Sequence, residues 1–199
     1  MSDSTDKKEL FLLRHGDTGL RGKYIGATDV GLSVKGRQQA SRTGKMLGAF
    51  QFDKIFCSPM IRCVETLKLI KQNCPGEQLS SLKEVDFGRW EGKDFSTIVA
   101  EDPTLVDQWV INPGDFTFPE GESLQQFRGR VADVAKMINE TAAAKTLIVS
   151  HGGVIRHLLC HLMHLSVENY LLFDIQPGCF STVQLHEEGG ILTGLNLRG

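Results

Sequence analysis

Hydrophobic residues follow two patterns along the chain: short continuous runs, and longer stretches in which apolar positions recur every three or four residues. The runs at residues 9–13, 53–57 and 146–150 predict buried strands. Residues 78–82 predict a further strand, and 180–185 with 191–197 predict an edge hairpin. The predicted helices cover 33–49, the segment from 58 to just before Pro75, 95–100, 104–111, 124–138 and 154–165. This alternation predicts an α/β fold, a three-layer sandwich whose central sheet is mostly parallel with one antiparallel edge strand.

Capping residues refine some of these boundaries. Ser33 precedes the first helix, and its hydroxyl suits the N-cap position. Ser58 and Pro59 are typical of N-cap and N1, so they predict that the second helix begins there. Residues 112–121 contain two prolines and two glycines, which predicts a loop.

Length and composition restrict the class of protein. The 199 residues can bury a sizeable core, and we expect a single domain over 1–199 with a short solvated tail at 1–8. The net charge of −2 does not indicate a nucleic-acid or membrane surface. No apolar run reaches the roughly 18 residues of a membrane span. Five cysteines without CxxC spacing favour free thiols and a cytoplasmic location.

Residues suited to binding an anion follow three of the predicted strands. Arg14 and His15 follow the first, Ser58 follows the second with Arg62 one helical turn later, and His151 follows the strand that ends at residue 150. Because the carboxyl ends of parallel strands share one edge of a sheet, these side chains are expected to meet. Two arginines and two histidines packed together would repel one another without an anion, and guanidinium groups fit phosphate oxygens. The sequence therefore predicts a phosphate site at this edge.

Chemistry on a phosphate ester also needs an acid that protonates the leaving oxygen. An irregular, aromatic-rich segment supplies three candidates, Glu84, Asp86 and Glu91. Burial against Phe87 or Trp90 would raise the pKa of a carboxyl group toward the useful range. The residues alone do not choose among the three.

Six ordered blocks of the chain together resemble the histidine phosphatase superfamily, which has the phosphoglycerate-mutase-like fold. The blocks are Arg14-His-Gly-Asp-Thr18, Gly36-Arg-Gln-Gln-Ala40, Cys57-Ser-Pro59 with Arg62 and Thr66, Leu82-Lys-Glu-Val-Asp-Phe-Gly88, Glu91-Gly92 and Ser150-His-Gly-Gly153. The resemblance implies that His15 is the phosphoryl-accepting nucleophile and that Glu84 donates and later accepts the proton. It also implies that Arg14, Arg62 and protonated His151 hold the phosphate oxygens, with no metal or cofactor. The implied substrate contacts are Arg14, His15, Thr18, Arg21, Ile25, Gly26, Arg62, Glu84, His151 and Gly152.

The chain departs from the family pattern in its first turn. Many members have Asn where this chain has Arg21, and Glu where it has Asp17.

Residues 92–122 are expected to form a lid-like insertion. Between 94 and 127 the chain has no Lys or Arg, whereas related mutases carry such residues here for a second anionic group. The segment has seven acids, which are Asp94, Glu101, Asp102, Asp107, Asp115, Glu120 and Glu122. Over the pocket they would disfavour a polyanionic substrate, which favours hydrolysis over mutase activity. The aromatic residues Trp90, Trp109, Phe116 and Phe118 either offer a surface to the leaving group or belong to the core.

The predicted function is metal-independent hydrolysis of a small phosphomonoester through a phosphohistidine. The loop at residues 22–33 resembles that of α-ribazole phosphatases, which implies α-ribazole 5′-phosphate, from cobalamin nucleotide-loop assembly, as the substrate. Neither nucleic acid nor a membrane is expected as a partner, and a dimer is one option for the oligomeric state.

Several alternatives stay open at this point. They are a phosphoglycerate mutase, a broad-specificity sugar or nucleotide phosphatase, a phosphatase that acts on protein phosphohistidine, and a non-catalytic phosphate-binding module. The spacing of His157, His161 and His164, with Cys160 beside them, could also hold zinc.

Overall fold

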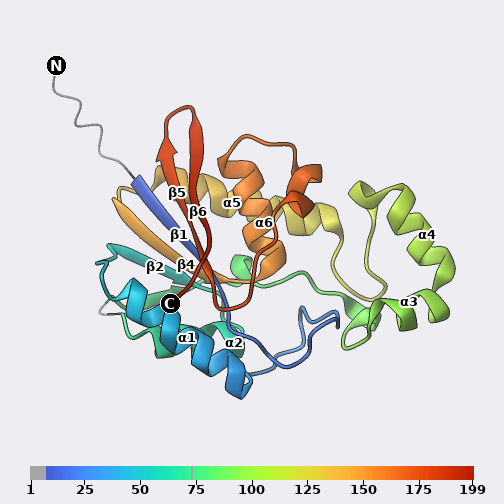
Figure 1. Ribbon diagram of the computed structural model, residues 1–199. Coiled ribbons are helices and arrows are strands. Elements are labelled where there is room, and N and C mark those ends of the chain that lie inside the picture. The colour runs from blue at the N-terminus through green and yellow to red at the C-terminus, as the bar shows by residue number, and fades with distance from the viewer. Residues whose placement is uncertain (1–7, 73) are drawn as a thin grey trace.

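The computed structural model describes residues 8–72 and 74–199, which form a six-stranded sheet with helices on both faces (Figure 1). The strands are β1 (Lys8–Arg14), β2 (Lys54–Cys57), β3 (Gly76–Gln78), β4 (Lys145–Ser150), β5 (Phe180–His186) and β6 (Gly189–Leu197). The α-helices are α1 (Val34–Leu47), α2 (Ile61–Ile70), α3 (Phe95–Glu101), α4 (Pro103–Ile111), α5 (Leu124–Glu140) and α6 (Gly152–Leu162). Short 3₁₀ turns are η1 (Ser80–Leu82), η2 (Gly88–Trp90), η3 (Pro113–Asp115) and η4 (Val167–Leu172). The predicted tail at 1–8 lies outside the described residues except for Lys8, with which β1 begins.

The strand order is β3-β2-β4-β1-β5-β6. The neighbours from β3 to β1 pair in parallel, β5 pairs antiparallel with β1, and β6 completes the edge hairpin antiparallel to β5. The predicted α/β sandwich with a mostly parallel sheet and an antiparallel edge is therefore confirmed.

The central strand β1 is apolar from Leu10 to Leu13 because helices cover both of its faces. Leu10 and Leu12 belong to the core cluster that contains residues of α5 and α6. Phe11 and Leu13 belong to the cluster with residues of α1 and α2 on the opposite face. Figure 1 shows these two helix pairs on either side of the sheet. A strand buried on both faces has a continuous apolar sequence rather than an alternating one.

The three strand ends that were expected to meet are neighbours in the sheet. Arg14 at the end of β1 pairs with Ser150 at the end of β4, and Cys57 at the end of β2 pairs with Val149. The backbone N–H of His15 then donates to the Ser150 carbonyl at 3.0 Å. The residues that follow these strands therefore share one edge of the sheet.

The predicted start of the second helix at Ser58 and Pro59 is wrong, because α2 begins at Ile61 with Met60 as its N-cap. The hydroxyl of Ser58 lies 2.8 Å from Nε2 of His151, so it is engaged across the sheet edge. The carboxylate of Asp29 accepts the N–H of Ile61 at 2.7 Å and takes the place of the missing side-chain cap.

The strand predicted at residues 78–82 is also wrong, because β3 ends at Gln78 and Ser80–Leu82 forms the turn η1. The Leu82 carbonyl accepts the hydroxyl of Ser150 at 2.8 Å, which ties this turn to the end of β4. The last helix, predicted at 154–165, covers Gly152–Leu162 instead. His164 beyond it has a φ of 54°, a left-handed conformation that ends a helix.

Gly16 and Gly36 allow the turn after β1 to pack backbone against backbone on the start of α1. A Cβ on Gly36 would lie 2.0 Å from the Asp17 carbonyl oxygen, and one on Gly16 would lie 2.5 Å from the Gly36 carbonyl oxygen. The same Asp17 carbonyl accepts the backbone N–H of Ser33 at 2.9 Å. This packing fixes the turn that carries His15 against α1.

We expect Gly36→Ala to lower the free energy of unfolding by about 1–3 kcal/mol, because the new methyl group overlaps backbone atoms that cannot rotate away. Gly129→Ala is the matched control, since Gly129 lies in α5 and a Cβ at this position would meet no other atom within 4 Å. Removing a helical glycine there should raise the free energy of unfolding by about 0.5–1 kcal/mol. Urea titration measures both values, and two changes of the same sign would contradict this account of the turn.

Candidate active site

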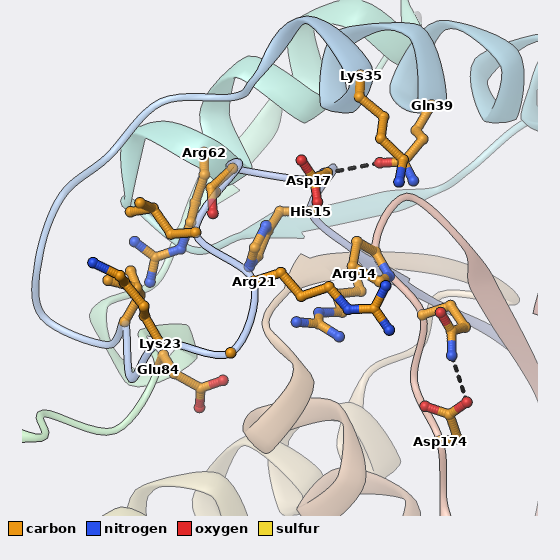
Figure 2. Close-up of a pocket in the computed structure, with 16 residues that line it drawn as sticks. Arg14, His15, Asp17, Arg21, Lys23, Lys35, Gln39, Arg62, Glu84 and Asp174 are labelled. Atoms are coloured by element: carbon orange, nitrogen blue, oxygen red, sulfur yellow. Dashed lines mark hydrogen bonds between the residues drawn. The ribbon is translucent and has the colours of Figure 1, made fainter. Parts of the chain in front are cut away.

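A cavity of about 310 Å³ lies at the edge where β1, β2 and β4 end, with His15 in its wall. Its basic side chains are Arg14, Arg21, Lys23, Lys35 and Arg62. Its acidic side chains are Asp17, Glu84 and Asp174. Figure 2 shows these residues arranged around His15. The excess of positive charge suits an anionic ligand.

His15 is held in one tautomer. Its Nδ1 lies 2.8 Å from the carbonyl oxygen of Gly16, and because a carbonyl only accepts, Nδ1 carries the proton and Nε2 keeps its lone pair. Burial, reinforced by the charges of Arg14 and Arg62, lowers the pKa of His15 to about 3. The ring is therefore neutral near pH 7, as a nucleophilic nitrogen must be.

Carbonyl oxygens, rather than carboxylates, orient the two inner arginines. Arg62 is 1% exposed, and its Nη1 and Nη2 donate to the carbonyls of Thr28 at 2.9 Å and Gly26 at 2.7 Å. Arg14 donates from Nη1 to the carbonyl of Ile175 at 2.5 Å. Over residues 8–72 and 74–199, neither arginine forms an ion pair with a carboxylate within 4.0 Å. Both guanidinium charges thus remain available to an anion.

His151 lies behind His15, with the two ring centroids 5.1 Å apart. Its Nδ1 accepts the Nε–H of Arg62 at 3.1 Å, so Nε2 carries the proton and donates to the hydroxyl of Ser58 at 2.8 Å. Burial, followed by the charges of His15 and Arg62, holds the pKa of His151 well below its usual range. The ring is therefore neutral here, in contrast to the protonated form expected from the resemblance. In this arrangement His151 orients Arg62, and its contact with a phosphate oxygen stays a prediction.

The three candidate acids have different environments. Glu84 lines the cavity, and its Oε2 accepts the N–H of Gly153 at 2.9 Å. Asp86 accepts the N–H of Gly88 at 2.8 Å within its own turn. Glu91 does not line the cavity. Of the three, only the Glu84 carboxyl can reach a ligand bound beside His15.

Glu91 instead holds the loop that orients Arg62. Its Oε1 accepts the N–H groups of Gly26 and Ala27, both at 2.9 Å. Its Oε2 accepts the N–H of Thr28 at 3.1 Å and the hydroxyl of Thr28 at 2.5 Å. Because the carbonyls of Gly26 and Thr28 bind Arg62, the Glu91 carboxylate positions that guanidinium through the loop.

The two glycines that follow His151 allow close packing. A Cβ on Gly153 would lie 2.4 Å from Oε1 of Glu84, and one on Gly152 would lie 3.4 Å from Cζ of Arg14. Gly153 is therefore required for the backbone contact that fixes the Glu84 carboxylate.

Most of the predicted substrate contacts line the cavity. Those that line the cavity are Arg14, His15, Thr18, Arg21, Ile25, Arg62 and Glu84. Gly26, His151 and Gly152 lie behind it: Gly26 and His151 bind Arg62, and Gly152 packs on Arg14. The roles assigned to all of these residues stay predictions.

The cavity also contains residues that the sequence analysis missed. Lys35 and Gln39 are four residues apart and therefore lie on one face of α1, so the helical period after Ser33 could have indicated them. Asp174 and Gln176 come from the irregular segment before β5 and carry no periodic signal.

For Trp90, Phe116 and Phe118, the interpretation as a surface for the leaving group is wrong, whereas Trp109 is half-buried and lines a different cavity. Trp90, Phe116 and Phe118 are at most 5% exposed and pack on one another and on Trp109, with centroids 5.2–5.8 Å apart. No residue of the segment 92–122 is among those that line the cavity. Trp90, Phe116 and Phe118 belong to the same core cluster as Leu10 and Leu12 of β1, and Trp109 packs against it.

The acids of that segment serve local contacts. Asp94 caps α3, Glu101 pairs with Lys93, and Glu122 pairs with Arg130 at 2.7 Å. None of the seven acids of this segment lines the cavity. The basic residues that line the cavity come from outside the segment 92–122, so the wall carries a net positive charge.

The His157 region has a different arrangement from a metal site. Nδ1 of His157 donates to the Gly153 carbonyl at 2.9 Å, and its ring stacks on Tyr170 with centroids 4.7 Å apart. Within the described residues, no three His, Cys, Asp or Glu side chains are grouped so that they could hold a metal ion.

In the same part of the chain, no helix is both long and apolar enough to cross a bilayer.

Comparisons with known proteins agree with this geometry. The sequence model of the histidine phosphatase superfamily (branch 1) matches residues 10–198. The adenosylcobalamin/α-ribazole phosphatase of Escherichia coli K12 is 29% identical, over 95% of this chain and 96% of that protein. An acid phosphatase of Mycobacterium tuberculosis is 32% identical over 78% of this chain and 76% of its own length. The crystal structure of the α-ribazole phosphatase from Shigella flexneri superposes with a TM-score of 0.87 at 28% identity, covering 95% and 96% of the two chains.

We expect Glu91→Gln to weaken phosphate binding by about tenfold. The variant presents an NH₂ group to backbone N–H donors, so the loop that orients Arg62 loses acceptors and moves. Calorimetry with inorganic phosphate measures the change. Glu140→Gln, an exposed substitution at the end of α5, should leave the affinity unchanged. A normal affinity in Glu91→Gln would show that the loop holds Arg62 without this carboxylate.

Protein stability should fall as the pH is lowered from about 6.5 to about 3. The folded-state pKa of His15 is near 3, whereas the unfolded chain takes up the proton near pH 6.5, so acid favours the unfolded state across this window. The slope from one such group reaches about 1.4 kcal/mol per pH unit. Denaturant titrations over this range should give a shallower slope for His15→Gln than for the wild type. Equal slopes would contradict the neutral, buried state of His15.

Proposed function

The chain belongs to the histidine phosphatase superfamily (branch 1) and is a phosphatase, and we propose that it hydrolyses small phosphomonoesters without a metal ion, through a phosphohistidine at His15. One observation carries the proposal: a neutral His15 with a free Nε2 lies beside the buried Arg62 and the half-buried Arg14, which, within the described residues, lack carboxylate partners within 4.0 Å.

In the first step, Nε2 of His15 attacks phosphorus while the bond from phosphorus to the ester oxygen breaks. The positive charge that develops on the ring is tolerated because the hydrogen bond from Nδ1 to Gly16 strengthens as the ring gains charge. Glu84, in its protonated form, gives its proton to the departing oxygen, so the leaving group departs as an alcohol.

In the second step, the Glu84 carboxylate takes a proton from a water molecule, and the resulting hydroxide attacks phosphorus. The bond from phosphorus to Nε2 breaks, inorganic phosphate forms, and His15 returns to its neutral state. Glu84 is again protonated and ready for another ester.

Arg14 and Arg62 hold the equatorial oxygens of the phosphoryl group as negative charge spreads over them. Their carbonyl partners fix the direction of the guanidinium groups before substrate binds, so little reorganisation is needed during the reaction. Nδ1 of His151 accepts the Nε–H of Arg62. The other N–H donors of that side chain are therefore left for the cavity and the two carbonyls.

For the substrate, we propose α-ribazole 5′-phosphate. The support comes from the E. coli relative and the S. flexneri structure, whose names state this activity and whose lengths this chain covers almost fully. The loop at residues 22–33, which supplies Lys23 and Ile25 to the cavity wall, provides the sequence resemblance.

The decisive experiment measures phosphate release from a panel of phosphomonoesters, including α-ribazole 5′-phosphate, with and without EDTA. We expect EDTA to have no effect and His15→Ala to lower kcat/KM by at least about a thousandfold, because the nucleophile is lost. The wild type should also form an acid-labile phosphoenzyme that the variant cannot form. His186→Ala, an exposed position at the end of β5, is the matched control and should keep full activity.

Two outcomes would contradict the proposal. Activity retained in His15→Ala would exclude the phosphohistidine, and activity abolished by EDTA would exclude the metal-free reaction. Efficient interconversion of 2- and 3-phosphoglycerate would make the protein a mutase. Phosphate binding without release from any ester would make it a non-catalytic phosphate-binding module.

A further inference from the structure

The turn that carries Glu84 is held by side chains rather than by backbone pairing. Glu84 follows the short turn η1, which ends at Leu82. Within the described residues, the carbonyls of Leu82, Lys83 and Glu84 accept no backbone N–H. The hydroxyl of Ser150 donates to the Leu82 carbonyl, and the other two carbonyls are left for other donors. The position of the Glu84 carboxyl therefore depends on groups from elsewhere in the chain.

Arg130 of α5 supplies those donors. Its Nη1 donates to the carbonyls of Ser81 at 2.8 Å and Lys83 at 2.6 Å, and its Nη2 donates to the carbonyl of Glu84 at 3.1 Å. Its Nε and Nη2 also donate to the two carboxylate oxygens of Glu122, at 2.7 and 2.8 Å. All the N–H groups of this guanidinium thus have a partner.

The plane of the guanidinium is fixed from two sides. Phe127 lies three residues earlier on the same face of α5, and its buried ring has the Cζ of Arg130 4.8 Å from its centroid. Glu122 is itself held, because its backbone N–H donates to the Asp86 carbonyl at 2.9 Å. The fork of donors therefore meets the turn at residues 81–84 in one orientation.

Arg130 does not line the cavity, so it can reach the chemistry only through the main chain of Glu84. The side chain of Glu84 does line the cavity, where it accepts the N–H of Gly153 at 2.9 Å. A shift of this turn by about 1 Å would take the carboxyl out of hydrogen-bond reach of the departing oxygen. A cation that only stabilised α5 would need a carboxylate, and would not need the carbonyls of the turn that carries the proposed acid.

We propose that Arg130 is a positioning residue for proton transfer: together with Glu122, it holds the main chain of Glu84 so that this carboxyl can protonate the departing oxygen. The inference rests on the proposed role of Glu84 and extends that role to α5. It gives Arg130 no contact with the substrate. Loss of Arg130 should therefore impair proton donation to the leaving group and spare the binding of phosphate.

The test compares two esters whose leaving groups differ in their need for a proton. One is the alkyl phosphate that the wild type hydrolyses best in the panel above, since an alkoxide leaves poorly unless it is protonated. The other is 2,4-dinitrophenyl phosphate, whose leaving group is a stable anion. The kcat/KM value covers the steps up to release of the alcohol, so hydrolysis of the phosphohistidine does not enter it. Arg130→Gln should lower kcat/KM about a hundredfold for the alkyl ester and less than about threefold for the aryl ester.

Arg128→Gln is the matched control. Arg128 lies on the same helix, its side chain is 16% exposed against 22% for Arg130, and it pairs with Glu168 away from the turn. This variant should leave both values unchanged. Glu84→Gln should show the same selective loss, and adding Arg130→Gln to it should lower the alkyl value little further, because both act on one step. Equal losses on both esters in Arg130→Gln would overturn the proposal.

Loss of Arg130 also leaves the Glu122 carboxylate without its partner, which destabilises this part of the fold. A double variant, Arg130→Gln with Glu122→Gln, removes both charges and so avoids the unpaired carboxylate. It should keep the selective loss on the alkyl ester. A return of the alkyl value to the wild-type level would mean that lost stability, rather than a displaced Glu84, caused the defect, and the proposal would be wrong.

NMR spectroscopy detects the same displacement without turnover and separates this inference from the proposed function. The amide proton of Gly153 donates to Oε2 of Glu84, so its chemical shift should change in Arg130→Gln and stay constant in Arg128→Gln. If the wild type hydrolysed no ester but this change was seen, the proposed function would fail while the hold of Arg130 on Glu84 stood. An unchanged Gly153 signal in Arg130→Gln would remove the role of Arg130 alone.

Discussion

The site depends on two guanidinium groups, the half-buried one of Arg14 and the buried one of Arg62, which the protein orients without pairing them to a carboxylate. Carboxylate partners would hold Arg14 and Arg62 in place more strongly, yet they would also cancel the charge that an anion needs. Carbonyl oxygens of Gly26, Thr28 and Ile175 solve this problem, because they fix direction through hydrogen bonds and carry no net charge. The same uncompensated charge helps burial keep His15 neutral, since it opposes a further cation nearby. The carbonyl contacts that leave the arginines free for an anion therefore also favour the neutral form of His15.

The fold supports this arrangement through backbone contacts between distant segments. Parallel pairing of β1 with β4, and of β4 with β2, brings the ends of three strands together. Close approach at Gly16, Gly36 and Gly153 then fixes the turn of His15 and the carboxylate of Glu84. Glu91 completes the arrangement from outside the cavity by gathering the N–H groups of the loop that faces Arg62. Much of the geometry of the site is therefore built by residues outside the cavity wall.

The sequence predicted the architecture well, because apolar periodicity and strand ends are local signals. The order of strands and helices and the meeting of His15, Arg62 and His151 followed from those signals alone. The choice among Glu84, Asp86 and Glu91 did not, because it depends on which carboxyl faces a cavity formed by segments far apart in sequence. The start of α2 was missed for a similar reason: Ser58 binds His151 across the sheet edge, and Asp29 from another loop caps the helix. The acids between residues 94 and 127 did not predict the charge of the cavity, because none of them lines it; Lys35, which does, comes from α1 and was missed.

Because main-chain oxygens orient Arg62, the direction of its guanidinium group does not depend on which side chains this loop carries. A carbonyl is present whatever residue occupies the position, so the exposed Ala27, between the two carbonyl acceptors of this loop, can be exchanged while the acceptor geometry persists. A substitution at Ala27 can therefore change what the exposed side of the loop contacts while both carbonyls continue to hold the Arg62 guanidinium.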